Sequence, residues 1–191
     1  MSEPAKPFPV DAELDSSERQ AQFIHEHLRR VFLLIYRMVG NSADAQDLTQ
    51  ETFIKALQRR DQLKDAQRAA HWLSRIASNT AIDFLRRHGK VNFCEIDAMP
   101  EAVSARVLGE GTDGGPENPE TAVLRAERRG MLERGLAVLT ERERTALLLR
   151  DVEGLPAEEV ARRLNCSKAT VRSHIANARV KFRRYMESLP S

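Results

Sequence analysis

Apolar residues recur at three- and four-residue spacing over two parts of the chain, and no stretch of useful length alternates with period two. This spacing is typical of amphipathic helices, so the predicted fold class is all-α. Gly40 and Asn41 are expected to end the first helix, and Ser42 to cap the second. In this first part the helices are predicted over 17–39, 42–60 and 71–88.

The second part of the chain predicts four more helices. Thr140 and Glu143 have the spacing of a capping box. Asn165 is expected to end the short third helix in a left-handed conformation, and Ser167 to cap the last helix. The predicted spans are 120–139, 140–152, 156–165 and 168–186.

Residues 91–119 separate the two helical parts and carry no sustained period. Glycine, proline and acidic residues are frequent there, which is typical of a flexible, extended linker. Residues 1–16 hold three prolines and are expected to form a flexible leader. The predicted architecture is two small helical domains, 17–90 and 120–188, joined by a flexible acidic linker.

The formal net charge of +2 hides an uneven distribution. Residues 21–90 carry +5 and residues 121–191 carry +6, whereas residues 91–120 carry −6. Such charge asymmetry along a chain points to charged partners. The near-neutral net charge of the whole chain therefore does not argue against a nucleic-acid-binding function.

The composition also excludes several classes of protein. The longest apolar run, 31–36, is far shorter than the ~20 residues of a membrane span, and no signal peptide is visible. Cys94 and Cys166 are too few for a disulfide framework and are expected to be reduced thiols in the cytoplasm. No metal-ligand spacing, phosphate-binding loop or nucleophile motif occurs, so no metal, cofactor or catalytic residue is predicted.

Residues 156–186 have the pattern of a helix-turn-helix, whose second helix enters the major groove. Six basic residues and no acid lie between Lys168 and Arg184, which favours DNA binding over a solvated basic helix. Arginine and asparagine can read guanine and adenine, and cations late in the helix suit phosphates. The candidate DNA-binding residues are Lys168, Thr170, Arg172, Ser173, Ala176, Asn177, Arg179, Lys181 and Arg183.

The helix predicted over 71–88 has an apolar face and a polar face. Trp72, Arg75, Asn79 and Arg86 fall on the polar face. Cations beside a single aromatic suit unpaired bases, because the cations hold the backbone and the ring can stack. For Trp72 the alternative is half-buried packing at the start of a helix.

The helix predicted over 42–60 carries a polar acidic patch of Asp47, Gln50 and Glu51. These residues stand at i, i+3 and i+4 and therefore share one helix face. The patch suits docking to a basic protein surface. The alternative is helix capping and solvation.

Four stretches, taken together and in this order, resemble the extracytoplasmic-function (ECF) group of bacterial RNA polymerase sigma factors. The resemblance covers most of residues 20–186 and implies an all-α fold with sigma regions 2 and 4. It departs from the family at His174 and Asn177, where arginine is frequent, and at Pro156, where a Ser or Thr cap is frequent. The stretches are DAQDLTQETFIKA (44–56), HWLSRIASNTAIDFLRR (71–87), ENPE (117–120) and LTERERTALLLRDVEGLPAEEVARRLNCSKATVRSHIANAR (139–179).

The resemblance implies a role for each of these surfaces. The candidate DNA-binding face of 168–183 would meet the −35 promoter element. Asn79 and the loop 61–70 would hold a flipped base of the −10 element, and the acidic linker would follow the RNA exit path. Residues assigned to the polymerase core are Asp44, Asp47, Gln50, Glu51 and Phe53. Residues assigned to −10 DNA are Arg68, Trp72, Arg75, Asn79 and Arg86.

The sequence thus predicts a promoter-specificity subunit with no catalytic activity of its own. The resemblance also implies a membrane-anchored anti-sigma factor, and the N-terminal half looks like sigma factors of cobalt–nickel resistance operons. This resemblance implies that the protein controls a stress or metal-resistance regulon. The alternative is a helix-turn-helix activator whose N-terminal half senses a signal or dimerises; an enzyme or direct metal sensor has little support from the residues.

Overall fold

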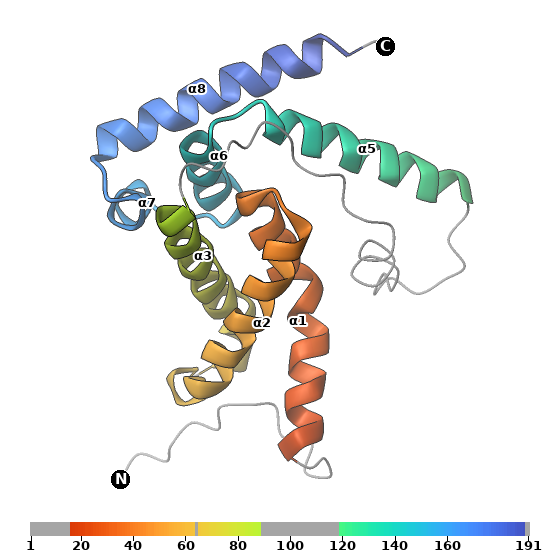
Figure 1. Ribbon diagram of the computed structural model, residues 1–191, viewed down its shortest axis with the longest axis vertical. Helices are drawn as coiled ribbons and strands as arrows, with labels where there is room; N and C mark the ends of the chain where they lie inside the picture. Colours follow the sequence, from red (N-terminus) through yellow and green to blue (C-terminus); the bar gives the residue numbers. More distant parts are fainter. Residues whose placement is uncertain (1–15, 64, 89–118, 190–191) are drawn as a thin grey trace.

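The computed structural model describes residues 16–63, 65–88 and 119–189, and all regular structure in these ranges is helical (Figure 1). The all-α prediction is therefore confirmed for the described part of the chain. The predicted leader 1–16 and linker 91–119 lie outside it, except for Ser16 and Pro119, which begin helices. None of the described helices is long and apolar enough to span a bilayer.

Three long helices form the N-terminal unit. Each pair of these helices is in contact, because each presents an apolar stripe to the other two. Ile35, Met38, Leu73 and Ala77 have no exposed surface and form the centre of this packing. The helices are α1 (Ser16–Val39), α2 (Ser42–Gln58) and α3 (Ala69–His88).

The junctions between these helices differ from the prediction in two places. Asn41, not Ser42, caps α2: its Oδ1 accepts a hydrogen bond of 3.0 Å from the backbone N–H of Asp44, and Ser42 is already helical. Gly40, at φ = 80°, makes the left-handed turn before it. The polar stretch before α3 also contains two short 3-10 turns, η1 (Arg60–Gln62) and η2 (Ala66–Arg68).

The C-terminal unit confirms the predicted caps. Thr140 and Glu143 make both hydrogen bonds of the capping box, Asn165 has φ = 50°, and the Ser167 hydroxyl accepts from the backbone N–H of Thr170 at 3.0 Å. These caps separate α7 from α8 by the short turn of a helix-turn-helix. The helices are α5 (Pro119–Ala137), α6 (Glu141–Leu147), α7 (Ala157–Leu164) and α8 (Lys168–Glu187).

The helix predicted over 140–152 is not α-helical throughout. Its last part, η3 (Leu148–Val152), widens to a π-helical turn, in which the backbone N–H of Glu153 reaches the carbonyl of Leu148. Nothing in the hydrophobic spacing signals this change. It leaves the side chain of Asp151 exposed and that of Glu153 nearly buried, so two acids only two residues apart lie on different sides of the turn.

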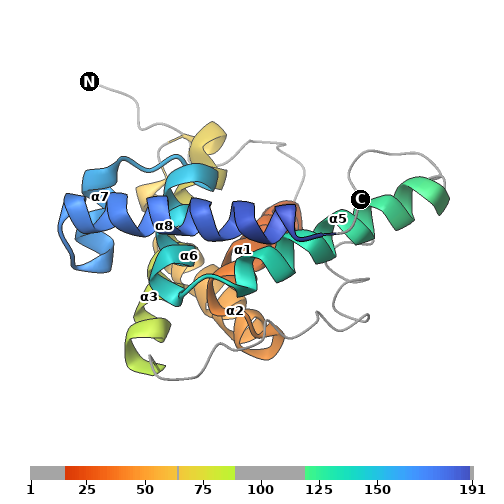
Figure 2. The ribbon, with the colours of Figure 1, turned by 90° about the horizontal axis from the view of Figure 1, so that it is seen from above.

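The two units are packed against each other and do not stand apart (Figures 1 and 2). Buried residues of α6, η3, α7 and α8 belong to the same hydrophobic cluster as those of α1, α2 and α3. α1 contacts α6, and α3 contacts α7. In Figure 2, α8 runs across the outer surface of the molecule and α5 extends away from it.

Candidate nucleic-acid interface

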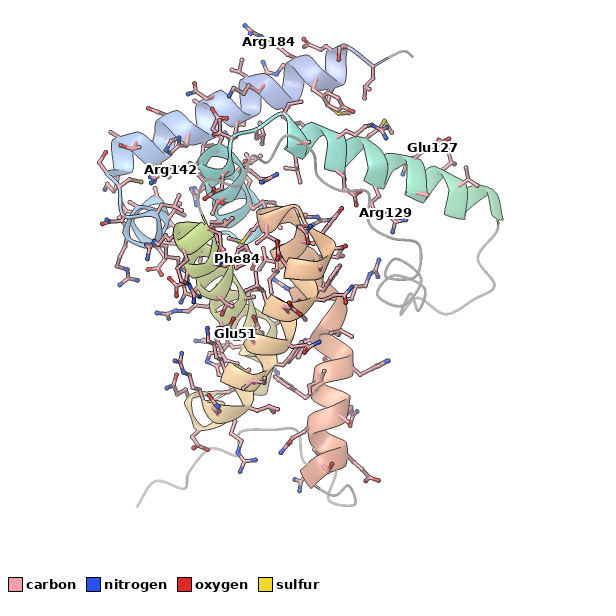
Figure 3. All side chains as sticks on the ribbon, in the orientation of Figure 1. Glu51, Phe84, Glu127, Arg129, Arg142 and Arg184 are labelled. Carbon is pink, nitrogen blue, oxygen red and sulfur yellow. The ribbon has the colours of Figure 1, made fainter. Side chains whose placement is uncertain are left out.

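α8 separates its apolar and polar sides as its sequence predicts. Val171 and Ala178 have no exposed surface and Ile175 retains only 9%, so this side of the helix packs on α6 and α7. In Figure 3, Arg184 points outward from the opposite side. The side turned to solvent exposes Lys168, Ala169, Arg172, Ser173, Ala176, Asn177, Arg179 and Arg183, while Thr170 and Lys181 are half-buried.

Three cations of this surface are paired with acids from neighbouring helices. Lys168 contacts Glu158 of α7 at 2.6 Å, and Arg179 makes a bidentate pair with Asp151 of η3 at 2.8 Å. Lys181 contacts Glu143 of α6 at 2.8 Å. The sequence shows no acid between Lys168 and Arg184, and the structure supplies one from each of three other elements. Since these partners lie 10 to 38 residues away, no local spacing predicts them.

The paired acids respond to these contacts. Burial alone would raise the pKa of Glu143, but hydrogen bonds from Lys181 and from Thr140 outweigh it and lower that pKa. The hydrogen bond from Lys168 lowers the pKa of Glu158. Arg172 and Arg183, by contrast, form no ion pair within the described residues. The surface therefore presents free guanidinium groups beside others that are held in place.

α8 also borders a shallow hollow on its N-terminal half. The hollow has a volume of about 500 Å³. Arg172, Ala176 and Arg179 of α8 line it, so three of the predicted DNA-binding residues meet there. The other lining residues are Arg150, Pro156, Ala157, Glu158 and Ile175.

α3 is held differently, because α1, α2 and α7 cover most of its circumference. Arg75, Asn79 and Arg86 remain exposed along one narrow strip, and Trp72 is half-buried against the core. The prediction of an exposed polar face is confirmed for the first three. Half-buried packing, the alternative for Trp72, describes what the structure shows.

A cavity of about 470 Å³ opens beside this strip, between the end of α2 and α3. Trp72, Arg75 and Asn79 meet in its wall. Lys55 of α2 and Arg59, which follows the last residue of α2, add two cations that the sequence analysis did not single out, although their place at the basic end of this helix could have suggested them. The remaining lining residues are Gln62, Ile76, Thr80 and Asp83.

Two residues of the predicted −10 set lie outside this cavity. Arg68 is 82% exposed in its side chain and pairs with Asp65 at 3.5 Å. Arg86 pairs with Asp83 and donates a hydrogen bond to the backbone carbonyl of Arg163 on α7. The structure therefore brings three of the five predicted residues to one site.

The acidic patch on α2 is open to solvent. Asp47 and Gln50 are exposed, and Glu51, in the middle of α2 in Figure 3, is half-buried and pairs with Lys55 at 2.6 Å. Asp44 is half-buried in the first turn. Phe53, which the sequence also assigns to this surface, is only 5% exposed and packs in the core of the free protein.

The neighbouring Ile54 is the apolar residue that α2 does expose, with 56% of its surface accessible. It follows Asp47 by seven residues and Gln50 by four, so the three lie on one helix face. This face therefore combines polar side chains with one exposed apolar side chain. Among the described residues, no three His, Cys, Asp or Glu side chains are grouped as metal ligands.

The fold and the surfaces together define a class of protein: an all-α protein that joins a helix-turn-helix to a second helical unit with its own basic strip. The sequence models of two families match this chain. They are Sigma-70 region 2, over residues 23–91, and Sigma-70 region 4, over residues 129–182. The chain belongs to the ECF group of RNA polymerase sigma factors.

Individual relatives support this assignment. The chain is 36% identical over 165 residues to the ECF sigma factor SigE of Mycolicibacterium smegmatis, covering 86% of this chain and 60% of that protein. It is also 36% identical over 155 residues to the sigma-H factor of Pseudomonas aeruginosa, covering 81% and 79%. Its fold is similar to that of the sigma factor RpoE of Bartonella quintana, solved in complex with the anti-sigma factor NepR, with a TM-score of 0.54, 20% identity and coverage of 89% and 98%.

Proposed function

We propose that this protein directs core RNA polymerase to promoters by reading two DNA elements with two separate helices. The observation that carries this proposal is the presence of both surfaces on one chain: the exposed side of α8 and the strip and cavity of α3. A helix-turn-helix activator would need only the first. The protein supplies specificity to the polymerase and performs no catalytic step itself.

On this proposal α8 reads the −35 element as duplex DNA. Arg172 and Asn177 are exposed and carry the bidentate groups that recognise guanine and adenine. Ser173 and Ala176 lie between them on the same face. The cations at Lys168, Arg179, Lys181 and Arg183, with Thr170 in the first turn, contact phosphates and set the register.

The cavity beside α3 holds one unpaired base of the −10 element. Lys55, Arg59 and Arg75 supply positive charge for the strand, Asn79 offers an amide to a base edge, and Trp72 forms part of the apolar wall. Extruding a base costs a few kcal/mol, so a cavity that accepts it contributes specificity as well as strand separation. Arg68 and Arg86 contact the flanking backbone.

The face of α2 with Asp47, Gln50 and Ile54 docks on the polymerase core, with Asp44 and Glu51 at its margin. Its acids suit a basic partner surface, and the exposed isoleucine supplies apolar area.

We further propose that an anti-sigma factor restrains this protein and that its regulon serves a stress or metal-resistance response. The fold neighbour solved with NepR supports the first point. The second point rests on the resemblance of the N-terminal half to sigma factors of cobalt–nickel resistance operons.

Run-off transcription with purified core polymerase tests the proposed function. Adding the protein to core and fragmented genomic DNA should produce discrete transcripts that core alone does not make. Their start sites should share two upstream sequence blocks. No promoter-dependent transcript from any template would contradict the proposal, and DNA binding without transcription would indicate an activator.

A further inference from the structure

A further cavity, of about 360 Å³, lies where the last two turns of α3 meet α6 and the end of α7 (Figure 1). It shares no lining residue with the cavity beside Asn79 or with the hollow beside α8. Of the residues that line it, only Arg86 belongs to a surface that the proposed function uses. The cavity is therefore a separate feature of the molecule, and promoter recognition does not explain it.

One part of its lining is apolar. Ile82 and Leu85 of α3 are 5% and 3% exposed, and Leu164, the last residue of α7, is half-buried. Cavities that bind small molecules commonly measure roughly 300–1,000 Å³ and combine apolar walls with a few polar groups. This cavity lies at the lower end of that range, so a body the size of one ring suits it.

Positive charge predominates in the polar part of the lining. Arg142 is exposed and forms no hydrogen bond or ion pair with a described residue. Arg86 donates to the backbone carbonyl of Arg163 and pairs with Asp83, which leaves further donors of its guanidinium group. One acid, the half-buried Glu141, also lines the cavity, and burial raises its pKa. Guanidinium groups bind carboxylates and phosphates well, so an anionic group suits this part.

A buried hydroxyl is the second, independent indication of a ligand. Thr145 of α6 lines the cavity and is only 1% exposed, and its Oγ1 has no hydrogen-bond partner among the described residues. The buried hydroxyls of Thr49 and Thr52 on α2, by contrast, donate to backbone carbonyls four residues earlier, at 2.6 and 2.7 Å. A buried hydroxyl without a partner destabilises a fold, and a polar group of a ligand would supply that partner.

We propose that this cavity binds a small organic acid, with its carboxylate or phosphate group held by Arg142 and Arg86. The apolar body of the acid lies against Ile82, Leu85 and Leu164. A polar atom of the ligand forms a hydrogen bond with the Thr145 hydroxyl. Because α3 supplies one wall and α6 and α7 supply the others, the bound acid contacts both helical units.

An NMR titration of the isotope-labelled full chain tests the site with a matched set of probes. Benzoate and phenyl phosphate carry both a ring and an acid group, whereas benzyl alcohol has no charge and inorganic phosphate has no ring. At least one of the two acids should bind about tenfold more tightly than both partial probes, because charge-assisted hydrogen bonds and apolar contact act together. The tighter acid distinguishes a carboxylate site from a phosphate site. The amide signals of Thr145 and Leu164 should shift, and that of Ile175 on α8 should not.

Arg142→Met tests the charged part of the site, because it removes the guanidinium group and keeps a long side chain. It should weaken binding of the tighter acid about tenfold. Arg162→Met is the matched control, since the Arg162 side chain is 70% exposed on the neighbouring α7 and does not line the cavity. It should leave the affinity unchanged. Circular dichroism confirms that both variants keep their helices.

Thr145→Val separates a ligand-binding hydroxyl from a structural one. The valine keeps the shape of the side chain and removes the hydroxyl, so the variant should have a higher Tm than the wild type in the absence of a probe. It should also bind the tighter acid about tenfold more weakly, because a hydrogen bond to a charged group is lost. A lower Tm would show that the hydroxyl already has a partner within the protein, which would contradict the site.

Two further results would overturn the proposal. One is that neither acid binds more tightly than inorganic phosphate, which would indicate an adventitious ion only. The other is binding of an acid that is unchanged in both Arg142→Met and Thr145→Val, which would place the probe elsewhere on the protein. Run-off transcription can be normal in either case, because the proposed function uses neither Arg142 nor Thr145. The proposed function would then stand without this site.

Discussion

The two proposed nucleic-acid surfaces are built on helices of equal length, 20 residues each, yet the protein holds them in different ways. α8 is anchored along one side and leaves its whole opposite side in solvent, with acids from three other elements holding its cations. α3 is enclosed by three helices and exposes only a strip beside a cavity. A convex, exposed helix fits a duplex groove, whereas a strip beside a cavity fits one base removed from the stack.

Reversing the acids of the proposed polymerase-binding face should have the largest effect, because it would keep both proposed DNA surfaces away from the polymerase. Asp47→Lys with Glu51→Lys should weaken core binding about a hundredfold at low salt, since like charges across an interface cost several kcal/mol. Glu26→Lys with Glu127→Lys, two exposed acids on α1 and α5, is the charge-matched control. Fluorescence titration against core measures both. Equal affinity of the two double variants would remove this face from the interface.

Asn79→Ala tests whether the α3 surface acts on unpaired DNA. It should slow formation of the open complex on a duplex promoter about thirtyfold, as expected for a loss of ~2 kcal/mol when the bound base covers a hydrogen-bonding group that then lacks its partner. Core binding should be unchanged. A template melted in advance around −10 should recover part of the loss. Parallel losses of core binding and promoter opening would show instead that the substitution damages the fold.

Arg172→Ala tests direct reading by α8. It should cost about 1–3 kcal/mol at the −35 element and reduce discrimination between base pairs there. Arg184→Ala, at the outer end of the same helix, should weaken all sequences alike, because a phosphate contact carries no sequence information. Competition binding of holoenzyme to promoter variants separates the two. Unchanged discrimination in Arg172→Ala would exclude this residue from the readout.

Glu143 tests how the protein holds α8 in place, because its carboxylate on α6 pairs with Lys181 of α8. The quantity measured is the stability of the folded protein. Glu143→Gln should destabilise the protein by about 1 kcal/mol at pH 7, since a cap and a charge-assisted hydrogen bond are weakened together. The pKa of Glu143 is lowered in the folded state, so its contribution is fully present above pH 4.5, its ordinary pKa, and is lost as the pH falls further. The Tm difference between variant and wild type should therefore shrink below pH 4.5. A difference that stays constant down to pH 3 would contradict this.

Asp151→Asn should have the smallest effect and should act only on α8. It frees Arg179 from its bidentate partner, so non-specific duplex binding should tighten a few-fold and the salt slope should steepen by about 0.9. Single-stranded −10 DNA should bind as before. An unchanged salt slope would mean that Arg179 makes no phosphate contact.

Local features of the fold could be predicted because each depends on a few residues that are close together in the sequence. The capping box at Thr140, the left-handed Asn165 and the Ser167 cap each depend on neighbouring residues. Asn41 displaced Ser42 as a cap because either side chain suits the position, and only the backbone decides which one precedes the first helical residue. The periods of 3.6 along α3 and α8 likewise placed their buried and exposed faces.

Features that join distant residues could not be predicted in this way. Helix packing decides which acids pair with the cations of α8. It also places Lys55 and Arg59 beside Asn79, and Arg163 against Ser78. Phe53 shows the same limit: Asp47 and Gln50 of the same motif are exposed, but the angle of Phe53 on the helix turns it to the core. Sequence therefore predicts which face of a helix is polar better than it predicts what that face meets.

Site-specific photo-crosslinking of the holoenzyme tests the central claim most directly. A photoreactive residue replaces Arg75 on α3 in one variant and Ala176 on α8 in another, and each is bound to the same promoter. We expect the α8 probe to label duplex DNA near −35 and the α3 probe to label unpaired bases about 25 base pairs, or ~85 Å, downstream. Labelling of one shared DNA segment by both probes, or of duplex DNA alone, would contradict the account.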